Sequence, residues 1–538
     1  HSYPHSWRSK APLIFRNAPQ WFISMTTTGL RDKALAAIDA TRFVPASGEK
    51  RLRGMIASRP DWLVSRQRAW GVPITVFVNK ETGEPLRDEA VNARVADAVA
   101  AGGADAWFST PAQEFLGDSY DAEDFDMVED ILDVWFDSGS THAFVLEQRD
   151  DLQWPASLYL EGSDQHRGWF HSSLLESSGT RGRAPYDAVL THGFLMDGKG
   201  YKMSKSMGNT VEPEKVIKQF GADILRLWVV ASDYSEDLRI GDEIIKGQVD
   251  AYRRLRNTFR FMLGNLNDFN DAESIDISEM PELDRWVLHR LSELDEVVRK
   301  GCNDYEFHAL YVALHNFCTV ELSAFYFDIR KDVLYCDGSD SVRRRSARTV
   351  LNEVFNCMTA WLAPILSFSM EEVWQNRYPE EQGSVHLTLF PDVPGNWRDD
   401  ALAAKWKIIR DVRRVVTGAL EIERREKRIG SSLQALPEVF VTEDQQTALA
   451  GIDLAEIAIV SDVKLTTGEG PSDAFRLEDV PGVSVVPDTA DGEKCQRCWM
   501  ILPEVSAGSD REHDDLCHRC DDVVTRNAGA APLETGAA

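Results

Sequence analysis

Two lysines and two serines stand within five positions at residues 202–206, in the sequence KMSKS. Gly198, Gly200 and Gly208 flank them, and glycine lets the backbone bend where other residues cannot. Lysine ammonium groups are mobile point charges that suit phosphate oxygens. A solvated basic turn would explain the five residues alone. The longer run over residues 191–209, THGFLMDGKGYKMSKSMGN, favours instead a flexible loop that closes on a polyphosphate while charge moves in a transition state.

Four cysteines near the C-terminus form two CxxC pairs, Cys495 with Cys498 and Cys517 with Cys520. Each pair can present two thiolates to one tetrahedral ion, and this spacing is typical of a four-cysteine zinc ribbon. Free thiols or disulfides are the alternative, and disulfides are the weaker choice in an acidic chain without a signal peptide. Because no catalytic group is obvious beside the four thiolates, we expect one structural Zn²⁺ per chain.

Polar residues are dense directly after a predicted strand at residues 157–160. In α/β sheets, ligands bind at the loops beyond the carboxyl ends of the strands. Glu161 and Gln165 could hydrogen-bond the hydroxyls and carbonyl of a ligand, and Gly162 would permit close backbone approach. Trp169 begins the next helix and could present its ring to an apolar ligand group.

Two further runs carry aromatic residues. Trp70 precedes a Gly-x-Pro loop in SRQRAWGVPI and could line the same pocket, although a simple core position is the preferred interpretation of this residue alone. The run DVWFDSGS at residues 133–140 is aromatic and acidic, and by itself it does not indicate a function.

The composition narrows the class of protein. A chain of 538 residues with 43% hydrophobic and 27% charged residues predicts several globular domains, and no apolar run reaches the ~20 residues that cross a bilayer. A net charge of −28 argues against nonspecific binding of nucleic acid through a global positive field. An RNA partner would need local basic groups. The chain has such groups at residues 253–260, 343–345, 410–414 and 424–428, although each is more often a solvated helix face.

The pattern of elements changes along the chain. Residues 52–237 predict an α/β domain with a largely parallel sheet, with strands at 74–78, 157–160 and 188–190 and helices at 169–178 and 216–231. Apolar residues at helical spacing predict a helical bundle over 242–376. A link at 378–397, a charged helix at 401–428, a small α/β unit at 435–485 and a linker at 487–493 lead to the cysteines.

These runs resemble one family over nearly the whole chain and in the same order, the bacterial isoleucyl-tRNA synthetases of class I. The similar pieces are PHSWRSKAPLIFRNAPQWFIS, SRQRAWGVPI, DVWFDSGSTH, YLEGSDQHRGWF, the THGF to KMSKSMGN run, GADILRLWV, LDRWVL, and CQRCW with CHRC. The run LEGSDQHRGWF separates the chain best from the valyl, leucyl and methionyl relatives, and the four-cysteine ribbon also favours the isoleucine type.

The resemblance implies a role for each matching residue. Glu161 would bind the isoleucyl-adenylate through its ribose, while Gly162, Asp164 and Gln165 would shape the aminoacyl and ribose site. Trp70 and Trp169 would wall the isoleucine side chain, and His192 and Gly193 would lie near the adenine of ATP. Lys202 and above all Lys205 would neutralise the ATP phosphates, with Mg²⁺ accompanying the ATP, and the four cysteines would hold the zinc.

The implied fold is multidomain α/β plus α. It comprises the exit of an inserted editing domain (1–50), the second half of a class I Rossmann-like catalytic domain (51–241), a helical anticodon-binding bundle (242–400), a C-terminal junction of a helix and a small α/β unit (401–486), the zinc ribbon (487–526) and a disordered tail (527–538). The implied activity is ATP-dependent ligation of L-isoleucine to tRNA(Ile) through isoleucyl-adenylate, by a cytoplasmic monomer with no membrane partner.

The chain departs from the family pattern in what it lacks. The HIGH-type histidine motif and nearly all of the editing domain are absent from the sequence, and the first residues, HSYPHSWRSK, include no initiator Met. We therefore expect a C-terminal part of the enzyme that forms no adenylate alone. A valyl-type synthetase and a noncatalytic RNA-binding zinc-ribbon protein are the alternatives. Retention of both LEGSDQHRGWF and KMSKS argues against the second, because a binding module needs no adenylate pocket.

Overall fold

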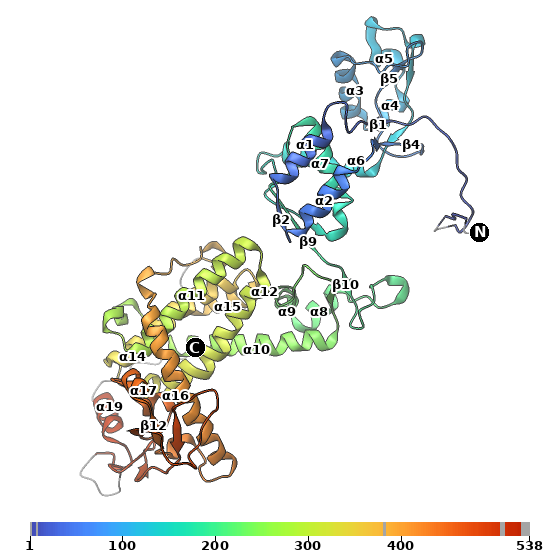
Figure 1. The fold of residues 1–538 in the computed structure, drawn as a ribbon. Coiled ribbons are helices and arrows are strands. Elements are labelled where there is room, and N and C mark those ends of the chain that lie inside the picture. The colour runs from blue at the N-terminus through green and yellow to red at the C-terminus, as the bar shows by residue number, and fades with distance from the viewer. Residues whose placement is uncertain (1–2, 7–8, 380–382, 506–511, 529–538) are drawn as a thin grey trace. The chain divides into compact units, whose positions relative to one another are not determined.

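The computed structural model describes residues 3–6, 9–379, 383–505 and 512–528. Two compact units make up the chain (Figure 1). The first runs to Leu195 and includes Tyr234–Leu238, and the second holds Met196–Asp233 and everything from Arg239 onward. The short strands β10 (Leu195–Met196) and β11 (Leu238–Arg239) lie where the chain passes between the units. This division falls inside the segment 51–241 that the sequence predicts as catalytic.

The first unit is built around a parallel sheet with the strand order β2-β9-β8. Its members are β2 (Arg42–Val44), β9 (Ala188–His192) and β8 (Tyr159–Gly162). Four of the five residues of the central strand β9 are buried, as expected where helices cover a parallel sheet. The main core of this unit joins strand residues to three helices, α1 (Leu30–Asp39), α2 (Ser47–Ala57) and α7 (Trp169–Thr180).

Smaller elements complete the first unit. Three antiparallel pairs are β1 (Phe22–Ile23) with β3 (Trp62–Leu63), β4 (Ser65–Arg66) with β7 (Ile131–Leu132), and β5 (Phe77–Asn79) with β6 (Phe125–Met127). The remaining helices are α3 (Glu89–Gly102), α4 (Ala106–Ser109), α5 (Ala112–Leu116) and α6 (Val134–Gly139). The predicted strand 74–78 begins only at Phe77, because a tight turn in which the Val76 amide donates to the Ile74 carbonyl precedes the ladder.

Long helices form most of the second unit, as the sequence predicts. They are α8 (Pro213–Phe220), α9 (Ala222–Val230), α10 (Asp242–Asn265), α11 (Glu282–Asp304), α12 (Phe307–Asn316), α13 (Phe327–Cys336), α14 (Val342–Leu362), α15 (Ser367–Arg377) and α16 (Asp400–Arg425). A π-helical segment, Phe317–Tyr326, joins α12 to α13. The prediction of one helix over 216–231 is wrong, because Gly221 at φ +91° ends α8 and α9 starts after it.

The C-terminal part of the second unit is mixed. A three-stranded sheet has the order β13-β12-β14, with β12 (Glu438–Val441) parallel to β13 (Lys464–Thr467) and antiparallel to β14 (Ser484–Val486). Helices α17 (Glu443–Leu449) and α18 (Leu454–Ala458) each contact the long α16, which also contacts β14. The hairpin β15 (Glu493–Lys494) with β16 (Ile501–Leu502) and helix α19 (His518–Ala528) carry the cysteines.

Two sequence predictions concern the ends and the surroundings of the chain. The predicted disordered tail lies outside the described residues from residue 529, and residues 527 and 528 end α19. None of the helices in the described part of the chain is long and apolar enough to cross a membrane.

Candidate functional site

The carboxyl ends of β8 and β9 bring several predicted residues together. In the parallel register Glu161 is paired with Thr191, and Gly162 is paired with His192. Glu161 and His192 are exposed while Gly162 is buried. A Cβ at Gly162 would lie 2.7 Å from an Asp164 carboxylate oxygen and 3.8 Å from the His192 ring, so the four residues share one edge of the sheet.

Gly193 has a structural reason to be glycine. Any Cβ there would overlap the backbone of Glu236, and the Gly193 amide donates to the Tyr234 carbonyl at 2.9 Å. The next amide, that of Phe194, donates to the Asp237 carboxylate at 2.7 Å. Gly193 therefore lets the segment Tyr234–Leu238 approach the end of β9, which is a role that the sequence pattern did not indicate.

Gln165 and Trp169 are tied to the start of α7. The Gln165 side-chain carbonyl accepts the Trp169 amide at 3.0 Å, which satisfies one of the amides left open at a helix start. The Trp169 ring stacks on Tyr159 with centroids 4.0 Å apart, and its indole N–H donates to the Ser138 carbonyl at 2.9 Å. One face of the Trp169 ring is thus covered within the protein.

The run at residues 133–140, which was hard to interpret from the sequence, forms α6 and supports α7. Asp133 caps α6 by accepting the Trp135 amide at 2.7 Å, and it also pairs with Arg66. The Ser173 hydroxyl on α7 donates to the Gly139 carbonyl at 2.8 Å. The Ser173 bond holds α7, and with it Trp169, against α6.

Trp70 does not lie in the core, so that interpretation is wrong. Its side chain is 88% exposed, in a loop that follows β4. The next residue, Gly71, packs its backbone so closely on Ile131 that a Cβ would overlap the isoleucine side chain. The chain at this point turns Trp70 outward, and its role in walling a ligand remains a prediction.

The KMSKS loop belongs to the second unit and is organised by two residues that the sequence analysis did not single out. The Asp197 carboxylate accepts the amides of Lys199 and Tyr201, both at 2.9 Å, and the side-chain amide of Asn209 at 3.0 Å. The Asn209 side-chain oxygen Oδ1 in turn accepts a hydrogen bond from the Ser204 backbone amide at 2.9 Å. The Asn209 bond, followed by the backbone bonds, holds the pKa of Asp197 below its usual range. An Asp-Gly turn signal could have identified Asp197.

Lys202 and Lys205 are both exposed on this loop. Lys202 lies opposite Met196 in an isolated β-bridge, and Lys205 begins a short helical turn, Lys205–Met207, capped by the Ser204 side chain. The loop therefore presents two ammonium groups on a backbone that is held at Asp197 and Asn209.

A buried carboxyl lies on α7 in the first unit. Among the described residues, Glu176 Oε1 has no hydrogen-bond partner, and a Cβ at Gly139 would overlap it. Burial, followed by the nearby charge of Asp137, raises the pKa of Glu176 to about 9. Glu176 is therefore neutral in the folded protein at pH 7.

We expect Glu176→Gln to stabilise the first unit at pH 7–8. The folded pKa of about 9 lies above the ordinary value of 4.5, so the neutral Glu176 makes its full contribution to the free energy of unfolding below pH 4.5. This contribution is lost as the pH rises toward 9, by at most about 1.4 kcal/mol per pH unit. Glutamine mimics the neutral acid and should flatten this dependence in denaturant unfolding.

Glu147→Gln is the control of opposite sign, because Arg181 lowers the pKa of Glu147. That variant should lose stability at neutral pH, and its deficit should shrink in acid. If the free energy of unfolding of Glu176→Gln changed with pH as steeply as that of wild type, the raised pKa of Glu176 would be contradicted.

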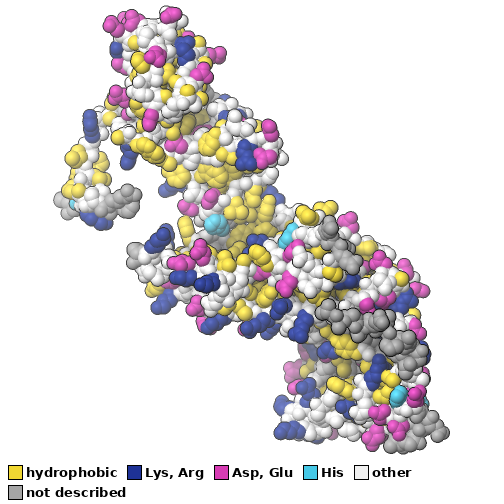
Figure 2. Space-filling view, turned by 180° about the vertical axis from the view of Figure 1, so that it is seen from behind, with side chains coloured by type: hydrophobic (Ala, Val, Ile, Leu, Met, Phe, Trp, Pro, Cys, Tyr) yellow, Lys and Arg dark blue, Asp and Glu magenta, His cyan; other side chains and the backbone are white. Residues whose placement is uncertain are grey.

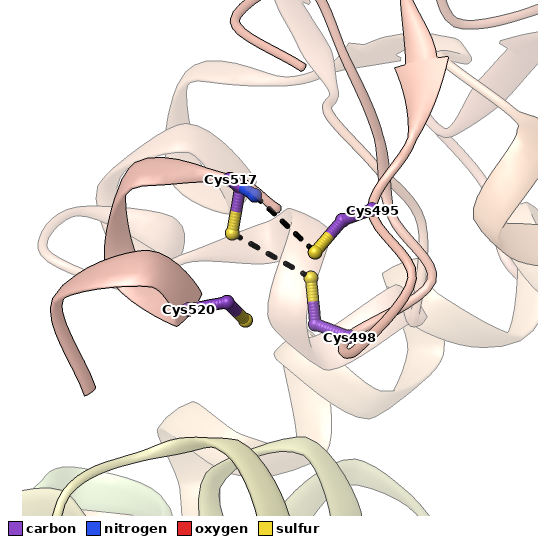
Figure 3. Close-up of side chains that lie close together, drawn as sticks. All are labelled: Cys495, Cys498, Cys517 and Cys520. Atoms are coloured by element: carbon purple, nitrogen blue, oxygen red, sulfur yellow. Dashed lines mark hydrogen bonds between the residues drawn. The ribbon is translucent and has the colours of Figure 1, made fainter. Parts of the chain in front are cut away.

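The four cysteines converge at one point (Figure 3). All four are buried, and their sulfur atoms lie within 4.8 Å of one another. The Cys498 and Cys517 sulfurs are 3.8 Å apart, which is about the edge of a tetrahedron with zinc–sulfur bonds of ~2.3 Å. The Cys517 amide donates to the Cys495 sulfur at 3.3 Å, and such donors favour thiolates. The geometry fits a four-thiolate metal site.

Each CxxC pair also carries an arginine between its cysteines. Arg497 donates to the carbonyls of Tyr335 and Cys336 at the end of α13, and Arg519 pairs with Asp332 at 2.6 Å and Asp337 at 3.2 Å. Both arginines therefore dock the ribbon on α13. Trp499, at 60% exposure, is the neighbouring side chain that faces outward.

A second cluster of potential ligands, His289, Glu293 and Asp400, does not form a convincing metal site. The His289 Nδ1 accepts the Asp399 amide at 2.9 Å, which leaves the proton on Nε2, 3.5 Å from Glu293. Arg290 and Arg398 both pair with Glu293. These contacts account for the cluster as a helix-capping network.

Comparison with known proteins gives three family matches. Residues 8–241 match the tRNA synthetases class I (I, L, M and V), residues 284–439 the anticodon-binding domain of tRNA ligase, and residues 492–523 the zinc finger found in FPG and IleRS. The last match contains the four-cysteine cluster.

Individual proteins are also similar. An isoleucine-tRNA ligase of Mesorhizobium japonicum is 58% identical over 529 residues, which are 96% of this chain and 53% of the relative. One of Brucella abortus is 58% identical over 526 residues, 96% of this chain and 54% of the relative. A solved Mycobacterium tuberculosis methionyl-tRNA synthetase in complex with methionyl-adenylate is 18% identical with a TM-score of 0.49, covering 72% of each chain.

The chain spans about half the length of the curated relatives it matches. The match at 58% identity covers 96% of this chain. The chain therefore belongs to the isoleucine-tRNA ligase family of the class I tRNA synthetases.

Proposed function

We propose that this chain is part of an enzyme that joins L-isoleucine to tRNA(Ile) with ATP, through an isoleucyl-adenylate. The observation that carries the proposal is the group of polar residues at the carboxyl ends of β8 and β9, in a chain that also keeps the KMSKS loop. A parallel sheet binds ligands at this edge.

Two steps make up the proposed reaction. A carboxylate oxygen of isoleucine attacks the α-phosphorus of ATP, and pyrophosphate leaves. A ribose hydroxyl at the end of the tRNA then attacks the adenylate carbonyl, and AMP leaves. No protein nucleophile takes part, so catalysis consists of positioning and of charge stabilisation.

The exposed Glu161 carboxylate is suited to accept hydrogen bonds from the adenylate ribose, with Gly162, Asp164 and Gln165 shaping the site around it. His192 at the end of β9 and the adjoining Gly193 would face the adenine. Lys202 and Lys205 would meet the phosphates, on a backbone that the Asp197–Asn209 contact holds in place. Mg²⁺ would accompany the ATP as the hard cation that phosphates prefer.

The isoleucine side chain would contact Trp169 and Trp70. The Tyr159 stack covers one face of Trp169, which leaves the other face for the ligand. Trp70 is 88% exposed and contributes a large apolar surface without rearrangement of the core. One zinc ion held by Cys495, Cys498, Cys517 and Cys520 would have a structural role, because four thiolates leave no open position. We further propose a cytoplasmic monomer.

The test is amino-acid-dependent exchange of pyrophosphate into ATP, measured with the full-length enzyme that contains this sequence. Isoleucine should support exchange and charging of tRNA(Ile), and valine should be the weaker substrate. Glu161→Gln should lose most of the exchange. A preference for valine would replace the proposal with a valyl-type enzyme, and tRNA binding without any exchange would favour a noncatalytic RNA-binding protein.

A further inference from the structure

The four-cysteine site assembles negative charge in a buried place. Four thiolates carry two more negative charges than one Zn²⁺ neutralises, and all four cysteines are buried. Buried charge is costly unless hydrogen-bond donors or cations face it. One donor is the Cys517 backbone amide, which lies 3.3 Å from the Cys495 sulfur. A second donor comes from the side chain of Arg497.

Arg497 lies between the cysteine cluster and the end of α13. Its Nη1 donates to the Cys520 sulfur at 3.7 Å and to the Cys336 carbonyl at 2.5 Å, and its Nη2 donates to the Tyr335 carbonyl at 3.0 Å. Both carbonyls belong to the last turn of α13, where the helix itself supplies no partner. One guanidinium therefore caps α13 and contacts a ligand sulfur. The Cys336 thiol donates back to the Arg497 carbonyl at 3.8 Å.

The arginines of the two CxxC pairs differ in how their charge is matched. Arg519 stands at the same position of its pair as Arg497, and its charge is matched by Asp332 and Asp337. The side-chain partners of Arg497 in the described part of the chain are two carbonyls and a sulfur. The charges that face Arg497 are thus the negative end of the α13 dipole and the Cys520 thiolate.

The environment of Arg497 also differs from that of an ordinary surface cation. Figure 2 shows many Lys and Arg side chains at the surface among Asp and Glu on the face that it displays, where water and salt weaken each interaction. Arg497 is only half-exposed, and it is held between a helix end and a buried sulfur. Its contact with Cys520 is therefore stronger than that of a solvated ion pair.

Binding of the metal changes what Arg497 faces. With the metal bound, the four thiolates are held together and their excess negative charge lies beside the guanidinium. Without the metal nothing holds this charge in one place. Arg497 therefore interacts more strongly with the metal-bound ribbon, while its other N–H groups stay on α13. By thermodynamic linkage, contact with α13 must then strengthen metal binding by the same factor by which the metal strengthens that contact.

We propose that Arg497 couples metal binding at the four cysteines to the docking of the ribbon on α13. Arg497 is a positioning residue, because it orients the Cys520 sulfur toward the other three ligands and ties that sulfur to the helix end. The inference rests on the zinc site of the proposed function. Its consequence is that the helical bundle contributes to zinc affinity through a residue that is not a ligand.

The first test is a zinc titration of the 538-residue chain in competition with a chromophoric chelator of known affinity. Arg497→Met removes the charge and the donors but keeps a long side chain. It should weaken zinc binding about 10–100-fold, the usual cost of losing a hydrogen bond to a metal ligand. Arg497→Lys keeps the charge and should recover part of this loss. Arg526→Gln is the control, because Arg526 is a 62% exposed arginine of α19 that pairs with Asp340, and it should bind zinc like wild type.

A second test separates the sulfur contact from a general loosening of the ribbon. A hydrogen bond stabilises the lone pairs of a thiolate, so in the Co²⁺-substituted chain Arg497→Met should shift the sulfur-to-cobalt charge-transfer band to lower energy. Arg519→Gln removes the ion pairs with Asp332 and Asp337 and should keep the wild-type band. At metal saturation both variants should be cleaved faster than wild type by a protease at residues 487–493.

The outcomes distinguish this inference from the zinc assignment. Wild-type zinc affinity in Arg497→Met, together with one zinc in the wild-type chain, would overturn the coupling and leave the zinc site standing. Equal band shifts in Arg497→Met and Arg519→Gln would assign the effect to a loosened ribbon and overturn the role of the sulfur contact. A wild-type chain that bound no zinc would remove the zinc site and this inference together.

Discussion

Replacing Lys205 by alanine in the full-length enzyme should slow isoleucine-dependent pyrophosphate exchange by about 10²–10³-fold, the usual cost of removing one preorganised donor from a developing charge. The physical reason is positional. Lys205 begins a helical turn capped by Ser204, and the amide of Ser204 is bonded to Asn209 at 2.9 Å. The ammonium group is therefore carried on a backbone that is already ordered before the substrate arrives.

Lys199→Ala is the matched control, because Lys199 lies on the same loop and its contribution to the turn is a backbone amide bonded to Asp197. This variant removes the same charge and should keep its exchange rate within a few-fold of wild type. The binding of isoleucine alone should be unaffected by Lys205→Ala, because the effect belongs to the transition state. A normal exchange rate in Lys205→Ala would remove this residue from the mechanism.

Local patterns were enough to predict the parts of the site whose geometry is local. A CxxC pair places two thiolates on one turn, and two such pairs predicted the cluster that Cys495 and Cys520 help to form. The polar run after β8 was likewise predictable, because strand ends and turn residues are set by nearby sequence. In the same way, Gly221 carried a signal for the break between α8 and α9, which the apolar periodicity of 216–231 concealed.

Contacts between distant segments could not be predicted in this way. Arg497 and Arg519 form their contacts with α13, which lies far earlier in the chain, so the residues around them in the sequence do not indicate that partner. Trp70 is a large apolar residue of the kind that fills cores, and its exposure of 88% depends on the fold of the surrounding chain. The pairing of Arg410 with aromatic rings instead of carboxylates also depends on helices that are brought together by folding.

Cys498→Ser should abolish zinc binding and unfold the ribbon, while the rest of the chain stays folded. The apolar core of the ribbon consists mainly of the metal-binding cysteines, with Cys336, Val505 and Leu516 beside them, and such a core is too small to fold alone. Metal binding then supplies the folding free energy, as in other small zinc domains. The main core of the second unit contains none of these residues, so its helices should keep their stability.

Native mass spectrometry and limited proteolysis would measure the two consequences. Wild type should carry one zinc, whereas Cys498→Ser should carry none and should be cleaved after the end of β14, because without the metal Arg497 and Arg519 no longer hold their positions on α13. Cys336→Ser is the matched control. Cys336 is a buried thiol in the same small core but stands outside the four-cysteine set, so this variant should keep the zinc and resist cleavage. Zinc retained by Cys498→Ser, or a metal-free wild type, would show that the four thiolates are not the metal site.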